Sequence, residues 1–482
     1  MKVKIKKQGA LSGGRRAFYF FAIIFTALML SLLMIFNQSF SAGSKDNVLD
    51  IIQQNPLQSL AVFGCVACIL LLYVLDTRAN NPAPDKRRNF IIPALGLIVV
   101  FVAQILLFDK RDIAFSPVLL CVLLTAVLVG TRAGLFINAV CAALSVLSLA
   151  LVGVYSGTDV ATLNLQSVLV YFITGAIMTI LLTKVHSRVG IVCAGSLISI
   201  FSYAVAFVLT YAITQSIEQS QSIAFVCALA NVASVVVFMF LLPLFESAFK
   251  VCTDFKLNEY CSFSKPLLQR LATEAPGTFS HCMVVSSLAE SCAMAIGENV
   301  LLARTAAYYH DVGKLKNAMF FVENQKGYNP HDELIPSVSA KKILSHTQYG
   351  YELLKQYGYP DEICDVALQH HGTTVAKFFY NKAMLITEGN VDKTEYSYSG
   401  PKPLSKIAAI VMISDAAEAA VRAMKEQSIT DVVNAIIKER LEEGQFDDCP
   451  ITLKELDTIA ETLSKVLSYI HHKRISYKEN LV

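Results

Sequence analysis

The chain has 482 residues, of which 54% are hydrophobic and 16% charged, and its mean hydropathy is +0.50. This composition excludes an ordinary soluble globular protein and places part of the chain in lipid. Residues 1–249 hold 16 Lys or Arg and 9 Asp or Glu, whereas residues 250–482 hold 25 and 29. A basic membrane half therefore precedes an acidic soluble half, and this balance argues against a nucleic acid polymer as partner.

Eight apolar segments in the first half predict membrane-spanning helices in a lipid bilayer. They lie at residues 17–36, 57–75, 90–108, 115–130, 134–154, 165–184, 190–213 and 221–249. The fourth is short for a span of about 20 residues, and we expect it to be tilted or partly interfacial. Almost no ionisable groups lie within these segments, which favours an anchor or a sensor over a transporter. We predict a transmembrane domain over residues 1–249.

The positions of the basic residues predict the orientation of these spans. With the N-terminus in the cytoplasm, the inner loops hold 13 Lys or Arg and the outer loops hold 3. Because basic residues concentrate on the cytoplasmic side, both termini are expected there, in a multi-pass protein of the bacterial plasma membrane. The first span has no cleavage signal close behind it, so we interpret it as a retained anchor.

Residues 250–482 predict a soluble, entirely helical domain. Apolar residues with helical spacing predict helices at 281–296, 300–309, 338–357, 361–370, 404–425, 429–442 and 453–470. Thr452 and Glu455 form a capping-box pattern at the start of the last helix. No alternating strand pattern stands out, and the Gly-, Pro- and Tyr-rich residues 388–403 predict a surface loop. The predicted fold class of the whole chain is all-α.

The histidines are the strongest chemical signal in the soluble half. Six of the nine lie within a short stretch, namely His281, His310, His331, His346, His370 and His371. Asp311 follows His310 directly, and Asp415 interrupts the apolar helix AAIVMISDAAEAAV, where an unpaired carboxylate is costly to bury. Imidazoles combined with two carboxylates suit two divalent ions such as Fe, Mn, Zn or Co, and not Ca²⁺.

In chain order these residues give the pattern H…HD…H…HH…D of an HD domain. Together with LLARTAAYYHDVGK, FFVENQ, NPHDEL, QHHGTTVAKFFY, GPKP and ISDAAEAAVRA, the pattern resembles the seven-transmembrane HD phosphohydrolases, including membrane-bound cyclic di-AMP phosphodiesterases of the PgpH type. The resemblance is strong over residues 253–477 and weak over the last seven spans. It implies one metal held by His281, His310, Asp311 and Asp415, and a second one, bridged through Asp311, held by His346, His370 and His371.

Two features depart from that family. Ser280 and Cys282 stand where its members usually have His and Ser. This difference changes the immediate neighbours of His281, but all the expected metal ligands are present. Only residues 37–56 lie where the family usually carries a long extracellular domain between the first span and the other seven. The signal that this domain senses in other members is therefore expected to be sensed differently here.

The resemblance implies hydrolysis of cyclic di-AMP to pApA in second-messenger signalling, with two Mn or Fe ions. Asp311 and Lys314 are the candidate catalytic residues, with Lys314 holding a phosphate as a point charge. Candidate substrate-binding residues are Lys314, Gly372, Thr373, Thr374, His331 and Tyr380. Purely structural roles also remain open for these residues. Lys314 can be solvated at a helix end, Thr373 and Thr374 can cap the local backbone, and Tyr380 can belong to the core.

Other functions also remain open at this stage. Gly358-Tyr359-Pro360 spells the tripeptide of cyclic di-GMP phosphodiesterases of the HD-GYP class, but it precedes His370-His371, whereas that class has it afterwards. Another nucleotide phosphohydrolase of the HD superfamily is a further alternative, as is a membrane receptor that binds a nucleotide without hydrolysing it. The sequence leaves open the native metal, the sensed signal, and whether the chain forms a homodimer.

Overall fold

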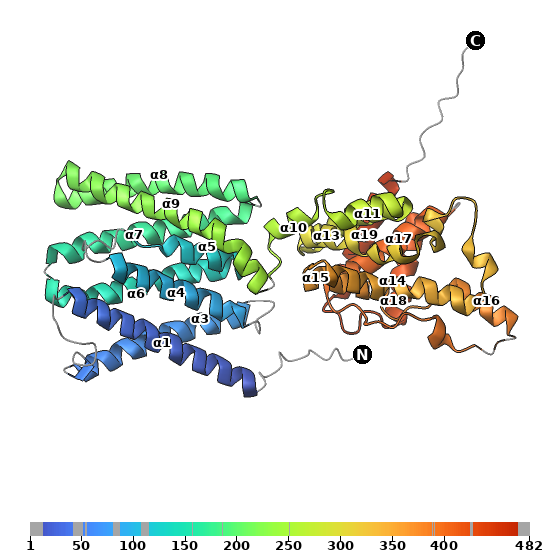
Figure 1. Cartoon of the computed structure of the whole chain (residues 1–482), viewed down its shortest axis with the longest axis horizontal. Helices are drawn as coiled ribbons and strands as arrows, with labels where there is room; N and C mark the ends of the chain where they lie inside the picture. The colour runs from blue at the N-terminus through green and yellow to red at the C-terminus, as the bar shows by residue number, and fades with distance from the viewer. Residues whose placement is uncertain are drawn as a thin grey trace, which may run out of the picture. The chain divides into compact units, whose positions relative to one another are not determined.

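The computed structural model describes residues 13–41, 52–53, 55–80, 87–107, 115–156, 158–185, 187–249, 251–387, 389, 391–424 and 428–470. These residues form two compact helical units, which divide between Thr253 and Asp254 (Figure 1). Within the described ranges there is no β-strand, and one isolated bridge pairs Val375 with Ser397. The predicted all-α fold class is confirmed.

The first unit is a bundle of apolar helices. Its helices are α1 (Gly13–Ser41), α3 (Pro56–Asn80), α4 (Arg88–Leu107), α5 (Val118–Leu128), α6 (Thr131–Ser156), α7 (Thr158–Leu181), α8 (Arg188–Thr214) and α9 (Ile217–Ala248), with the 3₁₀ turn η2 (Leu182–Lys184) after α7. All of them except α5 are long and apolar enough to cross a membrane. The chain is therefore a multi-pass membrane protein.

The predicted fourth span, residues 115–130, contains a helix of only 11 residues, α5. Such a helix rises about 16 Å, roughly half of the hydrocarbon core. It runs antiparallel to α4, because Gln104 Nε2 donates to Ser116 Oγ at 3.0 Å while Cys121 Sγ lies 3.9 Å from the carbonyl oxygen of Pro93. Nearly all of its residues are buried. The helix thus returns the chain toward the side where α4 begins, enclosed by other helices.

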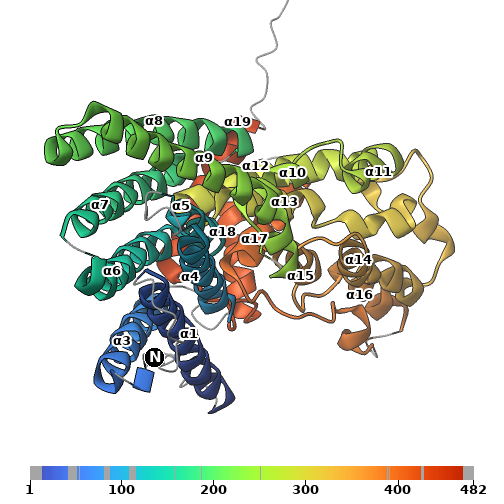
Figure 2. The same cartoon turned by 60° about the vertical axis from the view of Figure 1, so that its left-hand side comes forward.

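Helices α8 and α9 form the most extensive helix pair of the membrane unit and lie side by side in both views (Figures 1 and 2). Ser187 and Ser216 cap their N-termini through side-chain oxygens that accept from backbone amides. At the interface, a Cβ on Gly195 would lie 2.5 Å from Cγ2 of Val235. Gly195 therefore sets how closely the two helices approach, as small residues do between membrane helices.

In the residues of the second unit that the structure describes, there are ten α-helices with short 3₁₀ segments between them. The helices are α10 (Asp254–Tyr260), α11 (Pro266–Glu274), α12 (Pro276–Ile296), α13 (Val300–Tyr309), α14 (Pro336–Gln356), α15 (Asp361–Gln369), α16 (Lys377–Ile386), α17 (Lys406–Ala423), α18 (Ile429–Glu442) and α19 (Leu453–Ile470). The 3₁₀ segments are η3 (Val312–Phe320), η4 (Val322–Asn324), η5 (Pro330–Glu333) and η6 (Lys393–Tyr396). The seven predicted helices coincide with α12–α15 and α17–α19, and α10, α11 and α16 were not predicted.

The core of this unit lies among α12, α13, α17 and α19. Alanines at the contacts, such as Ala289, Ala306 and Ala409, are fully buried and let the helices pack closely. Helix α12 is also long and apolar enough to cross a membrane. However, its apolar residues are buried against the other helices of this core, so it belongs to the second unit. The predicted capping box is confirmed, because Thr452 N donates to Glu455 Oε2 at 2.8 Å and Glu455 N donates to Thr452 Oγ1 at 3.2 Å.

Substitution Gly195→Ala should weaken the α8–α9 pair. The added methyl group cannot fit beside Val235 without a shift, and overpacking of this kind costs about 1–3 kcal/mol. We expect a lower Tm for the variant in detergent, and a favourable coupling when Val235→Ala is combined with it. Gly64→Ala is the control, since a Cβ there meets nothing within 4 Å. An unchanged Tm for Gly195→Ala would contradict this account of the interface.

Candidate metal centre

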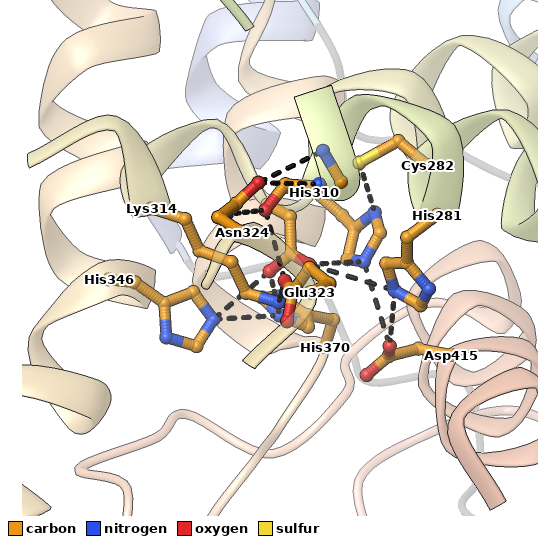
Figure 3. Close-up of polar contacts among 12 residues, drawn as sticks. His281, Cys282, His310, Lys314, Glu323, Asn324, His346, His370 and Asp415 are labelled. Atoms are coloured by element: carbon orange, nitrogen blue, oxygen red, sulfur yellow. Dashed lines mark hydrogen bonds and ion pairs between the residues drawn. The ribbon is translucent and has the colours of Figure 1, made fainter. Parts of the chain in front are cut away.

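Seven candidate ligands among the described residues come from five helical segments and converge in the second unit. Figure 3 labels five of them, namely His281, His310, His346, His370 and Asp415. They come from α12 (His281), the end of α13 (His310 and Asp311), α14 (His346), the end of α15 (His370 and His371) and α17 (Asp415). Helix α13 ends where the histidine–aspartate pair begins, because Asp311 leaves helical geometry at φ −104° and ψ 12°. The pair therefore lies at a helix end that faces the other ligands.

The first cluster joins His281, His310, Asp311 and Asp415, whose ligand atoms all lie within 4.8 Å of one another. His281 Nε2 lies 2.9 Å from Asp415 Oδ1, and His310 Nε2 lies 3.4 Å from Asp311 Oδ2. All four side chains are buried or nearly so. A compact, buried set of two imidazoles and two carboxylates has the composition of a transition-metal site.

The second cluster joins His346, His370 and His371, again with ligand atoms within 4.8 Å of one another. Asp311 connects it to the first cluster: Oδ2 faces His310, while Oδ1 lies 3.3 Å from His346 Nε2 and 3.7 Å from His370 Nε2. One carboxylate thus presents an oxygen to each cluster. This is the arrangement expected of a residue that bridges two metal ions.

Hydrogen bonds fix the tautomers of three of the histidines. The Nδ1 atoms of His310, His346 and His370 each donate to a backbone carbonyl oxygen. The acceptors are those of Ala307, Ile343 and Ala367, at 2.8, 2.7 and 2.9 Å. Nε2 is therefore the atom that each of these rings can offer to a metal, as metal-ligating histidines require.

The Nε2 atoms give a direct test of whether a cation fits. His346 Nε2 and His370 Nε2 lie only 3.2 Å apart, and the Nδ1 atom of each ring donates to a backbone carbonyl oxygen. His310 Nε2 and Asp311 Oδ1 are buried and have no hydrogen-bond partner among the described residues. Buried acceptors that face one another without donors are costly unless a cation lies between them. The residues fit a divalent metal centre.

Burial and neighbouring charge set the protonation of these groups. Burial lowers the pKa of His370 to about 4 and that of His371 well below its usual value, so both rings are neutral. Burial also opposes a charge on His281, but hydrogen bonds to Asp415 and Glu418 raise its pKa to about 9. Without metal, a proton on His281 Nε2 therefore occupies the direction from which a divalent cation would bind.

Lys314, the predicted phosphate contact, lies inside the site as an ion-pair partner. Its Nζ is 2.6 Å from Asp311 Oδ2 and 2.9 Å from Glu323 Oε1, and its side chain is 12% exposed. Burial opposes its charge, but Asp311 and Glu323 raise its pKa well above the usual value. The interpretation as a solvated helix-end lysine is therefore wrong, and contact with phosphate stays a prediction.

The segment that contains Glu323 also holds the helix of the first ligand. Asn324 Oδ1 accepts from the backbone amides of Gly277 and Thr278 at 3.0 and 3.2 Å, in the first turn of α12 (Figure 3). Those amides have no partner within the helix, so Asn324 acts as a cap contributed from a distant segment. This contact fixes the position of α12 and with it that of His281.

Gly372, Thr373 and Thr374 form a turn after the paired histidines. Gly372 has φ +53°, and a Cβ there would lie 2.3 Å from Gln445 Oε1. Gln445 Oε1 also accepts from the Thr373 amide at 3.0 Å, and Thr374 Oγ1 donates to the carbonyl oxygen of His371 at 2.8 Å. The turn thus holds the histidines in place through contacts within the protein. Its part in substrate binding stays a prediction.

His331 and Tyr380 lie to one side of the metal ligands. His331 is buried, with Nε2 2.8 Å from the carbonyl oxygen of Phe320 and its ring 4.8 Å from that of Phe379. Tyr380 packs on Tyr396 at a ring separation of 5.9 Å, within a small apolar cluster on α14 and α16. Neither residue contacts a metal ligand, so their predicted contact with substrate remains untested.

A cleft of about 330 Å³ opens beside the ligands. Its lining includes His370, His371, Thr374, Lys377, Phe378, Phe379, Tyr398, Asp415 and Arg440. Tyr398 stacks on His371 at 4.3 Å with an interplanar angle of 21°. Arg440 Nε is buried without a hydrogen-bond partner among the described residues. The cleft combines ligands, aromatic faces and cationic groups.

The sequence prediction missed Tyr398, Arg440 and Glu418. The segment with Tyr396 and Tyr398 was predicted as a surface loop, yet both rings turn inward. The chain is extended at Ser397, directly after η6, where Ser397 pairs with Val375 and Tyr398 N donates to the carbonyl oxygen of Thr374 at 2.9 Å. The alternation in YSYS was the available signal, because residues two apart share a face in extended chain. Nothing in the local pattern distinguishes Arg440 from other surface charges of α18.

The tripeptide Gly358-Tyr359-Pro360 has a structural role. Tyr359 is buried, and its ring lies 4.4 Å from that of Tyr260 and 4.7 Å from that of Tyr309. Gly358 has φ +73° at the end of α14, where glycine commonly ends a helix. None of the three lines the cleft, so the tripeptide gives no support to a cyclic di-GMP site.

Gly313 should be essential for the alignment of the two clusters. A Cβ at this position would lie 1.9 Å from the carbonyl oxygen of His346 and 2.6 Å from Gly350 N. Both are backbone atoms, so Gly313→Ala must push η3 away from α14 and separate Asp311 from His346. We expect at least a tenfold weaker affinity for the second of two bound Mn²⁺ ions, measured by EPR titration. Parent-like binding of both ions would contradict this, and Gly64→Ala is the control.

Comparisons with known proteins agree with this architecture. Residues 278–420 match the HD domain family, and residues 55–253 match the family described as 7TM receptor with intracellular HD hydrolase. The cyclic-di-AMP phosphodiesterase PgpH of Listeria monocytogenes is 34% identical over 447 residues, which is 89% of this chain and 60% of the relative. PgpH of Bacillus subtilis is 37% identical over 437 residues, which is 88% of this chain and 60% of the relative.

The chain spans about 60% of the length of these curated relatives. Among solved structures, the HD domain of Listeria monocytogenes PgpH in complex with cyclic-di-AMP is 49% identical, with a TM-score of 0.42. That match covers 44% of this chain and all of the solved domain. The two family matches, in the same order as the two structural units, lead to one conclusion. The chain is similar to seven-transmembrane proteins with an HD hydrolase domain, and the second unit holds residues that fit a divalent metal.

Proposed function

We propose that this protein is a membrane-anchored, metal-dependent phosphodiesterase that hydrolyses cyclic di-AMP to pApA. The observation that carries the proposal is the pair of ligand clusters joined by Asp311, next to a cleft with aromatic and cationic walls. The assignment of cyclic di-AMP as the substrate rests on the names of the relatives. The assignment of phosphoester hydrolysis rests on the site, since this reaction at two metals needs no nucleophilic side chain.

We propose that the centre holds two ions, Mn or Fe. His281, His310, Asp311 and Asp415 would hold one of them, and a second would be held by the other three histidines together with Asp311. Imidazole and carboxylate donors suit these borderline metals. When bound, the ions supply Lewis acidity, which ionises water at neutral pH and polarises the phosphoryl group.

The remaining residues bind and orient the substrate in this proposal. Lys377 and Arg440 lie on the wall of the cleft, where each pairs with Glu439. In this proposal they turn from that carboxylate to the phosphates of an anionic dinucleotide. Tyr398 and Phe378 offer aromatic faces on which an adenine can stack. The volume of about 330 Å³ lies at the lower end of the range for ligand pockets. A part of the dinucleotide would therefore lie outside the cleft.

The substrate assignment can be tested on the full chain in detergent with Mn²⁺. Cyclic di-AMP should be converted to pApA, followed by liquid chromatography, at a higher kcat/KM than cyclic di-GMP or deoxynucleotides. Asp311→Ala should abolish turnover and lower the bound Mn²⁺ together, because one carboxylate serves both clusters. Asp361→Ala, which removes an exposed carboxylate of α15, is the control.

Two results would contradict the proposal in different ways. Cleavage of another nucleotide in preference to cyclic di-AMP would replace the substrate and keep the reaction class. Tight binding of cyclic di-AMP by the parent without any turnover would instead make the protein a receptor. The complete ligand set favours hydrolysis over that alternative.

We further propose that both termini and the HD unit lie in the cytoplasm of a bacterial cell. The surplus of basic residues in the predicted inner loops supports this orientation. Green fluorescent protein fused after Val482 should fluoresce in cells, and alkaline phosphatase fused there should be inactive. The opposite pair of results would place the HD unit outside the cytoplasm and separate it from a cytoplasmic nucleotide.

A further inference from the structure

We propose that Glu418 is a positioning residue that orients His281 and increases the affinity of the first cluster for metal. Glu418 Oε2 lies 2.6 Å from His281 Nδ1, and the glutamate side chain is 4% exposed. A carboxylate accepts and does not donate, so Nδ1 of His281 carries the proton. Nε2, which lies 2.9 Å from Asp415 Oδ1, is then the ring nitrogen left to bind a metal in place of its own proton.

This contact differs from those of the other histidines in the centre. His310, His346 and His370 each donate Nδ1–H to a neutral backbone carbonyl three residues earlier. His281 instead donates to an ionisable side chain 137 positions away in the sequence. A carboxylate acceptor makes the opposite ring nitrogen a stronger ligand than a carbonyl acceptor does. The first cluster therefore receives additional negative charge through His281.

Helix α17 supplies both the ligand and the positioning group. Asp415 and Glu418 are three residues apart and lie on one face of the helix. Asp415 Oδ1 contacts His281 Nε2 while Glu418 contacts the opposite nitrogen, so the ring is held from both sides by one helix. Arg422, one turn further on, places Nη1 3.6 Å from Glu418 Oε1 and restrains the carboxylate. Most residues of α17 are buried, which makes this support rigid.

The charges of the two clusters are unequal as a result. The first contains Asp415 and shares Asp311, with Glu418 behind His281, whereas the second has three histidines and the shared carboxylate. A divalent cation is therefore attracted more strongly to the first cluster. Glu418 should contribute to this difference specifically, since none of the ligands of the second cluster contacts it in any hydrogen bond or ion pair described.

The test is a titration of the metal-free full chain with Mn²⁺, with free Mn²⁺ followed by EPR. Glu418→Gln retains a side-chain oxygen as acceptor but removes the charge, so we expect about tenfold weaker binding of the tighter ion. Glu418→Ala removes the acceptor as well and should weaken that ion further. Glu418→Asp keeps the charge at a greater distance and should fall between parent and alanine variant. Binding of the weaker ion should change little in all three.

Glu290→Gln is the matched control, because Glu290 lies on the same helix as His281 and pairs with Arg304 away from the centre. Thermal unfolding without metal identifies any variant that fails to fold, and the aspartate variant keeps the test available in that case. Parent-like Mn²⁺ binding by folded Glu418→Gln and Glu418→Asp would overturn the proposal. No nucleotide is used, so the result is independent of whether the protein hydrolyses cyclic di-AMP.

Discussion

The centre depends on one buried carboxylate. Asp311 is 1% exposed, and its two oxygens face two different groups of histidines. Burial opposes its ionisation, but Lys314 and His310 hold the pKa of this carboxyl well below its usual range. An ionised carboxylate in this position is costly without cations on both sides. Contacts from several helices hold Asp311 between the two groups of histidines. This requirement explains the positions of Gly313, Asn324 and Glu418, which lie far apart in the sequence.

The contacts that position Asp311 and the histidines come from several elements of the second unit. The absence of a side chain at Gly313 lets η3 approach α14 closely enough for Asp311 to reach His346. Asn324 fixes the start of α12, and Glu418 on α17 orients His281. These contacts are made within the second unit alone. The membrane unit has its own core and its own helix interfaces, and the candidate ligands all lie in the second unit.

The sequence predicted the parts of this protein that depend on local pattern. The apolar segments, the helices around the ligands and the Thr452–Glu455 box follow from composition, periodicity and capping, which act over a few residues. The HD pattern also selected the seven residues that the fold brings together. Contacts between distant segments were not predictable in this way. Glu418 and Tyr398 acquire their roles only when α17 and the 397–399 segment reach the histidines, and the short α5 is explained by its enclosure among other helices.

The EPR spectrum of the full chain loaded with Mn²⁺ tests the bridging role of Asp311 directly. A carboxylate that bridges two Mn²⁺ ions couples their spins, and the coupled pair has a spectrum distinct from that of isolated ions. We expect two Mn²⁺ per chain with a coupled spectrum. One ion per chain, or two ions with the spectrum of isolated Mn²⁺, would contradict the bridging role of Asp311.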